Sequence, residues 1–212
     1  MANFFSASEE EQLELISSIW DRYKYLILAL LAAISISIIY REYSISSSDS
    51  LQYESSREYE NFLSTEGEGK TLSASRIIES YPKSLYANFA SLYLAKIKVE
   101  ANDLKAAKIH LSSVLEQSTL SWGQTFNPLN SVARLRLARV LLEEGDAESA
   151  LNLVNEATIL TPSLYEVKGD AEILLGLVGE AKVSYLQALE LNTSQPIKAL
   201  ISMKISDLQE SK

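Results

Sequence analysis

The sequence predicts an all-α protein in which one transmembrane helix precedes a tetratricopeptide-like helical-repeat domain. Three observations support this fold class. One apolar run lies near the N-terminus, periodic segments alternate with turn residues over the rest of the chain, and small residues recur at fixed offsets. The composition agrees, because only seven Gly and four Pro occur among 212 residues that are otherwise rich in helix formers.

The apolar run covers sixteen residues, from Tyr25 to Tyr40, without one charged side chain. As a helix it is about 24 Å long, a little short of the ~30 Å hydrocarbon core of a bilayer. Aromatic rings and long basic side chains at the interfaces extend such a span. We therefore predict a transmembrane helix over residues 25–43, after a short, partly amphipathic segment over residues 1–24. The expected flanking anchors are Trp20, Lys24, Tyr25, Tyr40 and Arg41.

Two alternatives to a retained anchor fit less well. A buried helix of a soluble protein normally has a polar stripe, and only Ser35 and Ser37 interrupt this run. A cleaved signal peptide needs a basic N-terminal region, whereas residues 1–21 contain five acidic residues and no Lys or Arg. Charge does not decide the orientation of the helix, because two basic residues lie near each of its ends.

The remaining chain is predicted to form one domain, residues 53–212. Residues 44–52 are polar and are interpreted as a linker or as a continuation of the first helix. Residues 118–129 lack a period and are predicted to be a loop. Helices bounded by Gly, Pro and Asn-Asp turns are expected over residues 72–81, 84–100, 104–117, 130–144, 147–157 (closed by Pro162), 163–177 and 180–191, with a last one after Pro196.

Paired helices of this kind match the tetratricopeptide pattern, in which small residues lie where two helix backbones approach closely. Three sets share offsets of 0, 12 and 19 residues. Large apolar residues four positions after each middle member, namely Leu111, Val154 and Tyr185, are expected to fill the space between pairs. The three sets are Ala95, Ala107 and Val114; Ala138, Ala150 and Ala157; and Gly169, Ala181 and Ala188.

Stacked repeats leave a concave surface lined by the first helix of each pair, and we predict that this surface binds partners. Its mixed apolar and polar character suits an extended or partly unfolded polypeptide better than a small metabolite. Arg139 and Glu143 also have the i, i+4 spacing of an ion pair. For any single residue of this set, the alternative that a neighbouring helix covers it is about as well supported as a place in the groove. The expected groove residues are Phe89, Leu92, Lys96, Val99, Val132, Leu135, Arg139, Leu142 and Glu143.

No residue pattern indicates catalysis, a cofactor or a metal site, so we predict a protein that is not an enzyme. Cysteine is absent, and His110 is the only histidine. Gly69-Lys70-Thr71 resembles the end of a phosphate-binding loop, but the first glycine of that motif and the preceding strand are missing. A net charge of −9 argues against nucleic acid as a partner.

Four segments together resemble the YfgM family of ancillary SecYEG translocon subunits. The likeness covers nearly the whole chain, and its most specific pieces are LRLARV, KGDAEILL and the terminal MKISDL. The loop over residues 118–129 is longer than expected for that family. The segments are SLYANFASLYLAKIKVEANDLKAAKIHLSSVLEQS (84–118), VARLRLARVLLEEGDAESAL (132–151), KGDAEILLGLVGEAKVSYLQALE (168–190) and MKISDL (203–208).

The resemblance implies a single-pass protein of the bacterial inner membrane, with residues 1–24 in the cytoplasm and the repeat domain in the periplasm. It also implies three kinds of partner: the SecYEG translocon, a PpiD-like periplasmic chaperone, and secretory polypeptides on their way to periplasmic chaperones. The residues themselves leave an alternative open, in which a membrane-anchored scaffold assembles another envelope complex or regulates envelope stress signalling.

Overall fold

The computed structural model describes residues 9–119 and 126–210, and these residues form α-helices and the turns between them, with no strand. The prediction of an all-α chain is confirmed. The chain divides into two units, Met1–Tyr53 and Glu54–Lys212, which are described separately.

The first unit contains most of helix α1, which begins at Glu9 and ends at Ser64. Its segment Arg22–Ile39 is long and apolar enough to cross a membrane. The Leu and Ile side chains of this segment are exposed except that of Ile27, which is half-buried, whereas those of a core helix would be covered by protein. Residues 44–52 are helical and belong to α1.

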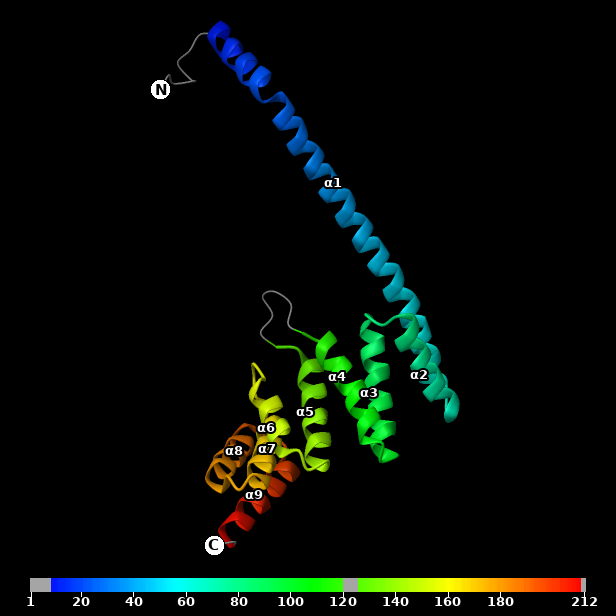
Figure 1. Cartoon of the computed structure of the whole chain (residues 1–212), viewed down its shortest axis with the longest axis vertical. Coiled ribbons are helices and arrows are strands. Elements are labelled where there is room, and N and C mark those ends of the chain that lie inside the picture. Colours follow the sequence, from blue (N-terminus) through cyan, green and yellow to red (C-terminus); the bar gives the residue numbers. More distant parts are fainter. Residues whose placement is uncertain (1–8, 120–125, 211–212) are drawn as a thin grey trace. The chain divides into compact units, whose positions relative to one another are not determined.

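The second unit contains the end of α1 and the helical repeats (Figure 1). Each helix from α2 onward packs against the next one in the chain. In addition, α3 contacts α5 and α5 contacts α7, which stacks the first helices of successive pairs. The helices are α2 (Glu68–Ser80), α3 (Leu85–Glu100), α4 (Leu104–Gln117), α5 (Pro128–Glu143), α6 (Ala147–Asn155), α7 (Pro162–Leu174), α8 (Val178–Leu191) and α9 (Gln195–Glu210).

Side-chain caps explain where several helices begin. Ser84, Asp103, Asp146 and Thr161 each accept a hydrogen bond from a backbone N–H in the first turn of α3, α4, α6 and α7. Pro162 opens α7 rather than closing α6, because a residue without an N–H is tolerated in the first turn of a helix.

Other helix boundaries also differ from the prediction, among them the end of α7, which lies at Leu174 rather than at residue 177. Helix α2 begins at Glu68, four residues before the expected 72, so that Gly69 is helical. Helix α5 begins at Pro128, inside the predicted loop over 118–129, because Asn127 caps it by accepting from the Leu129 N–H. The middle of that loop, residues 120–125, lies outside the described residues.

The first helices of the three units end in the same way. Asn102, Gly145 and Gly176 follow α3, α5 and α7 with positive φ values of 58°, 81° and 75°. In each case two backbone N–H groups bond back to the last turn, as in the bonds from Gly145 to the Leu142 carbonyl and from Asp146 to the Leu141 carbonyl. In each unit this turn occupies the same position relative to the small residues of the repeat pattern.

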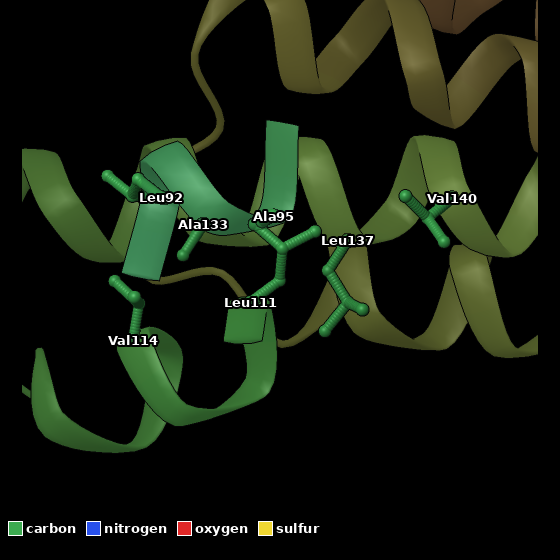
Figure 2. Close-up of a cluster of buried hydrophobic side chains, with 7 residues drawn as sticks. All are labelled: Leu92, Ala95, Leu111, Val114, Ala133, Leu137 and Val140. Carbon is green, nitrogen blue, oxygen red and sulfur yellow. The ribbon is translucent and has the colours of Figure 1, made fainter. Parts of the chain in front are cut away.

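The small residues of the repeat pattern lie between the helices. All eight alanines and valines among them are buried except Ala157, which is half-buried in the turn after α6. Leu111, Val154 and Tyr185 are also buried, as expected. Figure 2 shows the first of these cores, where side chains from α3, α4 and α5 converge: Leu92, Ala95, Leu111, Val114, Ala133, Leu137 and Val140.

A polar network ties α9 to α7 and α8. The Lys204 ammonium lies 2.9 Å from a Glu166 carboxylate oxygen and 2.7 Å from an Asp170 oxygen, and the Tyr185 hydroxyl donates to Asp170 at 2.7 Å. Burial, together with the nearby Asp170 carboxylate, raises the pKa of Tyr185. Burial opposes the charge on Lys204, yet the hydrogen bonds that it donates to Asp170 and Glu166 leave its pKa above the ordinary value. Lys204 is therefore charged, and its contacts with Glu166 and Asp170 hold α9 against α7.

Candidate functional site

An open groove of about 610 Å³ lies between α3, α4 and α5. Helices α3 and α5 supply its walls, and α4 supplies part of its floor. This volume falls within the range of protein clefts that hold small ligands, and it is comparable to a few residues of polypeptide. The lining residues are Ala95, Lys96, Val99, Glu100, Asn102, Leu104, Leu111, Arg136, Arg139, Val140 and Glu143.

The floor of the groove is the accessible edge of a hydrophobic core. Ala95, Leu111 and Val140 line the groove and also belong to the buried cluster of Figure 2. Val99, which is 43% exposed, extends the apolar surface toward solvent. An apolar side chain placed here would lose contact with water without requiring a change in the fold.

Charged side chains form the rim of the groove. Lys96 pairs with Glu100 on α3 at 3.6 Å, and both side chains are exposed. Arg139 lies 3.6 Å from Glu166 of α7. The expected i, i+4 pairing of Arg139 with Glu143 is therefore wrong, because the stacking of α5 on α7 brings the Glu166 carboxylate within reach.

Four of the residues predicted for a groove do line this one. Lys96 and Val99 come from α3, and Arg139 and Glu143 come from α5. The structure thus brings together residues that are about forty positions apart in sequence. Whether these residues contact a partner stays a prediction.

The other five predicted residues lie elsewhere. Leu92 is only 9% exposed and belongs to the core, so its placement in an open groove is corrected. Leu135 and Leu142 pack against the core between α5, α6 and α7, because the next hairpin covers that side of α5. Val132 is exposed but outside the groove lining. Phe89 is half-buried, with its ring 5.8 Å from that of Tyr59.

Arg136 is the groove residue of most consequence that the predicted set omits. Its guanidinium donates one long hydrogen bond, 3.5 Å, to the Leu92 carbonyl across the groove. The spacing from Arg136 to Val140 and Glu143, four and seven residues, places all three on one face of α5. That spacing was visible in the sequence, but only the packing of Leu135 and Leu142 against the next hairpin turns this face of α5 toward the groove.

The predicted membrane flanks are described in part. Trp20 and Tyr25 are exposed, and the Lys24 ammonium lies 5.8 Å from the centre of the Tyr25 ring. The side chains of Tyr40 and Arg41 lie outside the described part of the structure. Their role as interfacial anchors stays a prediction.

The residues considered for chemistry have other environments. Lys70 of the Gly-Lys-Thr string lies in α2, with its ammonium 5.0 Å from the centre of the Phe62 ring. His110 is half-buried on α4, where burial and the nearby Lys98 lower its pKa. Within residues 9–119 and 126–210, no three His, Asp or Glu side chains are placed to hold a metal ion.

Comparison with known proteins gives one finding on family. Residues 18–210 match the family model described as tetratricopeptide repeat-like domain. That range includes the apolar segment of α1 as well as the groove. No curated protein matches the sequence. Domains of this kind generally bind partner proteins and are typically non-enzymatic scaffolds. The chain belongs to the tetratricopeptide repeat-like domain family.

Proposed function

We propose that this protein is an ancillary subunit of the SecYEG translocon, anchored in the bacterial inner membrane by α1. Its N-terminus lies in the cytoplasm and its repeat domain in the periplasm. There the domain binds a PpiD-like chaperone and emerging secretory polypeptides, and helps to pass these polypeptides to periplasmic chaperones. The proposal combines the sequence resemblance to the YfgM family with the groove of the repeat domain.

The observation on which the proposal depends is the mixed chemistry of the groove. Its floor is apolar, and its rim carries three cations and two carboxylates. An unfolded polypeptide presents apolar and charged side chains close together, and such a groove can receive both. A closed, polar pocket would instead favour a small metabolite.

The exposed apolar face of α1 supports the membrane part of the proposal. Leu30, for example, is 58% exposed within the segment Arg22–Ile39. In a bilayer these side chains contact lipid or a neighbouring transmembrane helix. A translocon subunit next to α1 would supply such a helix.

Photo-crosslinking in native membranes tests the proposal. A photoreactive amino acid replaces Val99 in the groove, Leu30 in the span, or Val183 on α8 as a matched control that is exposed but outside the groove. We expect Val99 to give adducts with secretory polypeptides or a PpiD-like chaperone, and Leu30 to give adducts with the translocon. If neither position recovers any of these proteins, the proposal is wrong.

The same experiment separates the alternative of a scaffold for another envelope complex. In that case Val99 and Leu30 would give adducts with that complex or with a signalling protein. Protease digestion tests the orientation independently. We expect the repeat domain to be degraded once the outer membrane is opened while the inner membrane is intact, and resistance of the domain would contradict a periplasmic location.

A further inference from the structure

The groove has an electrical polarity that narrows the class of polypeptide it takes. This inference rests on the proposed function, since it concerns the same groove. Two of its three cations are already paired, Lys96 with Glu100 and Arg139 with Glu166. The charges that the fold leaves uncompensated decide what an incoming ligand must carry.

Those charges are Arg136 and Glu143. Both are exposed, and neither has an ion-pair partner among the described residues. Arg136 makes only its long hydrogen bond to the Leu92 carbonyl, which uses one of five donors. Groups in this state are available to a ligand without the cost of breaking an existing pair.

The two charges lie on one wall of the groove at a defined separation. They are seven residues apart on α5, so they share a helix face and are about 10.5 Å apart along the axis. Val140 lies between them on the same face and is part of the apolar floor. The wall therefore presents a cation, an apolar patch and an anion in that order.

We propose that the groove recognises an extended polypeptide segment in which an acidic and a basic side chain, three residues apart, flank two apolar residues. The acidic side chain binds Arg136, the basic one binds Glu143, and an apolar side chain covers Val140. A chain in the polyproline II conformation has three residues per turn and a rise of ~3.1 Å, so side chains three apart lie on one side at about 9.3 Å. This spacing matches that of the two free charges.

Four fluorescent peptides test the proposal against the full chain in lipid nanodiscs, by anisotropy at low ionic strength. Each has the sequence Gly-Ser-X-Leu-Leu-Z-Ser-Gly, where X and Z are Asp and Lys, Asp and Asp, Lys and Lys, or Asn and Gln. We expect the Asp/Lys peptide to bind about fivefold more tightly than the Asp/Asp or the Lys/Lys peptide. High salt should remove this preference.

Charge reversal provides a gain of function that a misfolded variant cannot imitate. Arg136→Glu should make the Lys/Lys peptide the preferred ligand, and Glu143→Arg should make the Asp/Asp peptide preferred. Lys182→Glu and Glu190→Arg are matched controls, because both residues are exposed on α8 and outside the groove. The controls should retain the preference for the Asp/Lys peptide.

The possible results are distinguishable. Equal binding of all four peptides overturns the inference but leaves a polypeptide-binding groove in place. A preference that does not change with Arg136→Glu and Glu143→Arg overturns the assignment to these two residues. Binding of no peptide contradicts the groove as a polypeptide site, and the proposed function fails with it.

Discussion

Replacement of Gly169 by alanine should destabilise the repeat domain, although alanine is the better helix former. Gly169 lies in α7, where the ring of Tyr185 on α8 packs directly against its backbone. A Cβ atom at residue 169 would lie 2.5 Å from Cε1 and 2.6 Å from Cδ1 of that ring. Ordinary contact begins near 3.4 Å, so the ring must withdraw by roughly 0.9 Å (3.4 − 2.5).

The Tyr185 ring cannot withdraw without loss of other interactions. It is 3% exposed, its hydroxyl donates to Asp170 at 2.7 Å, and the Lys204 ammonium lies 5.6 Å from its centre. Overpacking of a core costs ~1–3 kcal/mol, and a weakened hydrogen bond adds ~1 kcal/mol. The higher helix propensity of alanine offsets ~1 kcal/mol. We expect a net loss of about 2 kcal/mol in the free energy of unfolding.

Urea unfolding of the full chain in detergent, followed by circular dichroism, measures this effect. Gly179→Ala is the matched control, because a Cβ atom there meets no atom within 4 Å, so this change should stabilise by up to ~1 kcal/mol. In a Tyr185→Leu background, Gly169→Ala should also become neutral or stabilising, since the ring is gone. If Gly169→Ala stabilises the otherwise unchanged chain, or costs the same in both backgrounds, the close-approach argument is refuted.

Three further predictions concern stability. Lys204→Met leaves Asp170 without its cation and Glu166 with only the more distant Arg139, and should cost about 2 kcal/mol in the urea assay, less than for a fully buried pair because Asp170 is about one-third exposed; an unchanged midpoint would contradict this role. Ser84→Ala removes the cap of α3 and should cost ~1 kcal/mol by the same measurement, with Ser202→Ala on the exposed face of α9 as the control. Burial and Lys98 lower the pKa of His110 below 6.5, so the folded state binds a proton less readily than the unfolded state. The contribution of His110 to the free energy of unfolding is present above about pH 6.5 and is lost as the pH falls through the folded-state pKa. His110→Gln should therefore flatten the fall in stability between about pH 7.5 and 5.5. Identical pH profiles of the unchanged chain and the variant would refute this.

The helical repeats could be predicted from the sequence because their backbone geometry restricts residue size. Ala107, Ala138 and Ala150 lie where two helices approach, and a larger side chain would separate them. Helix ends were predictable for a related reason, since Gly145 and Gly176 occupy conformations that other residues adopt at a cost. Asn102 replaces glycine at the equivalent turn, and it tolerates the left-handed conformation better than most residues do.

The groove was harder to predict because the rotation of each helix is set by tertiary contacts. The predicted face of α5 is centred near Arg139, whereas the observed lining includes Arg136 and Val140 as well as Glu143. This corresponds to a rotation of about 60° at 100° per residue. Packing of Leu135 and Leu142 against α6 and α7 fixes that rotation, and the spacing within α5 alone does not contain it.

The three arginines of α5 show how the fold assigns different roles to similar residues. Arg134 is buried toward α6, where it donates to the Leu153 carbonyl and lies near Glu156. Two positions later, a turn of about 200° places Arg136 on the opposite side of the helix, at the groove. Arg139 is at the groove rim but already faces Glu166. The three side chains carry the same charge, but among them the fold leaves only Arg136 free to select a ligand. Substitution of Arg136 should therefore change specificity more than stability.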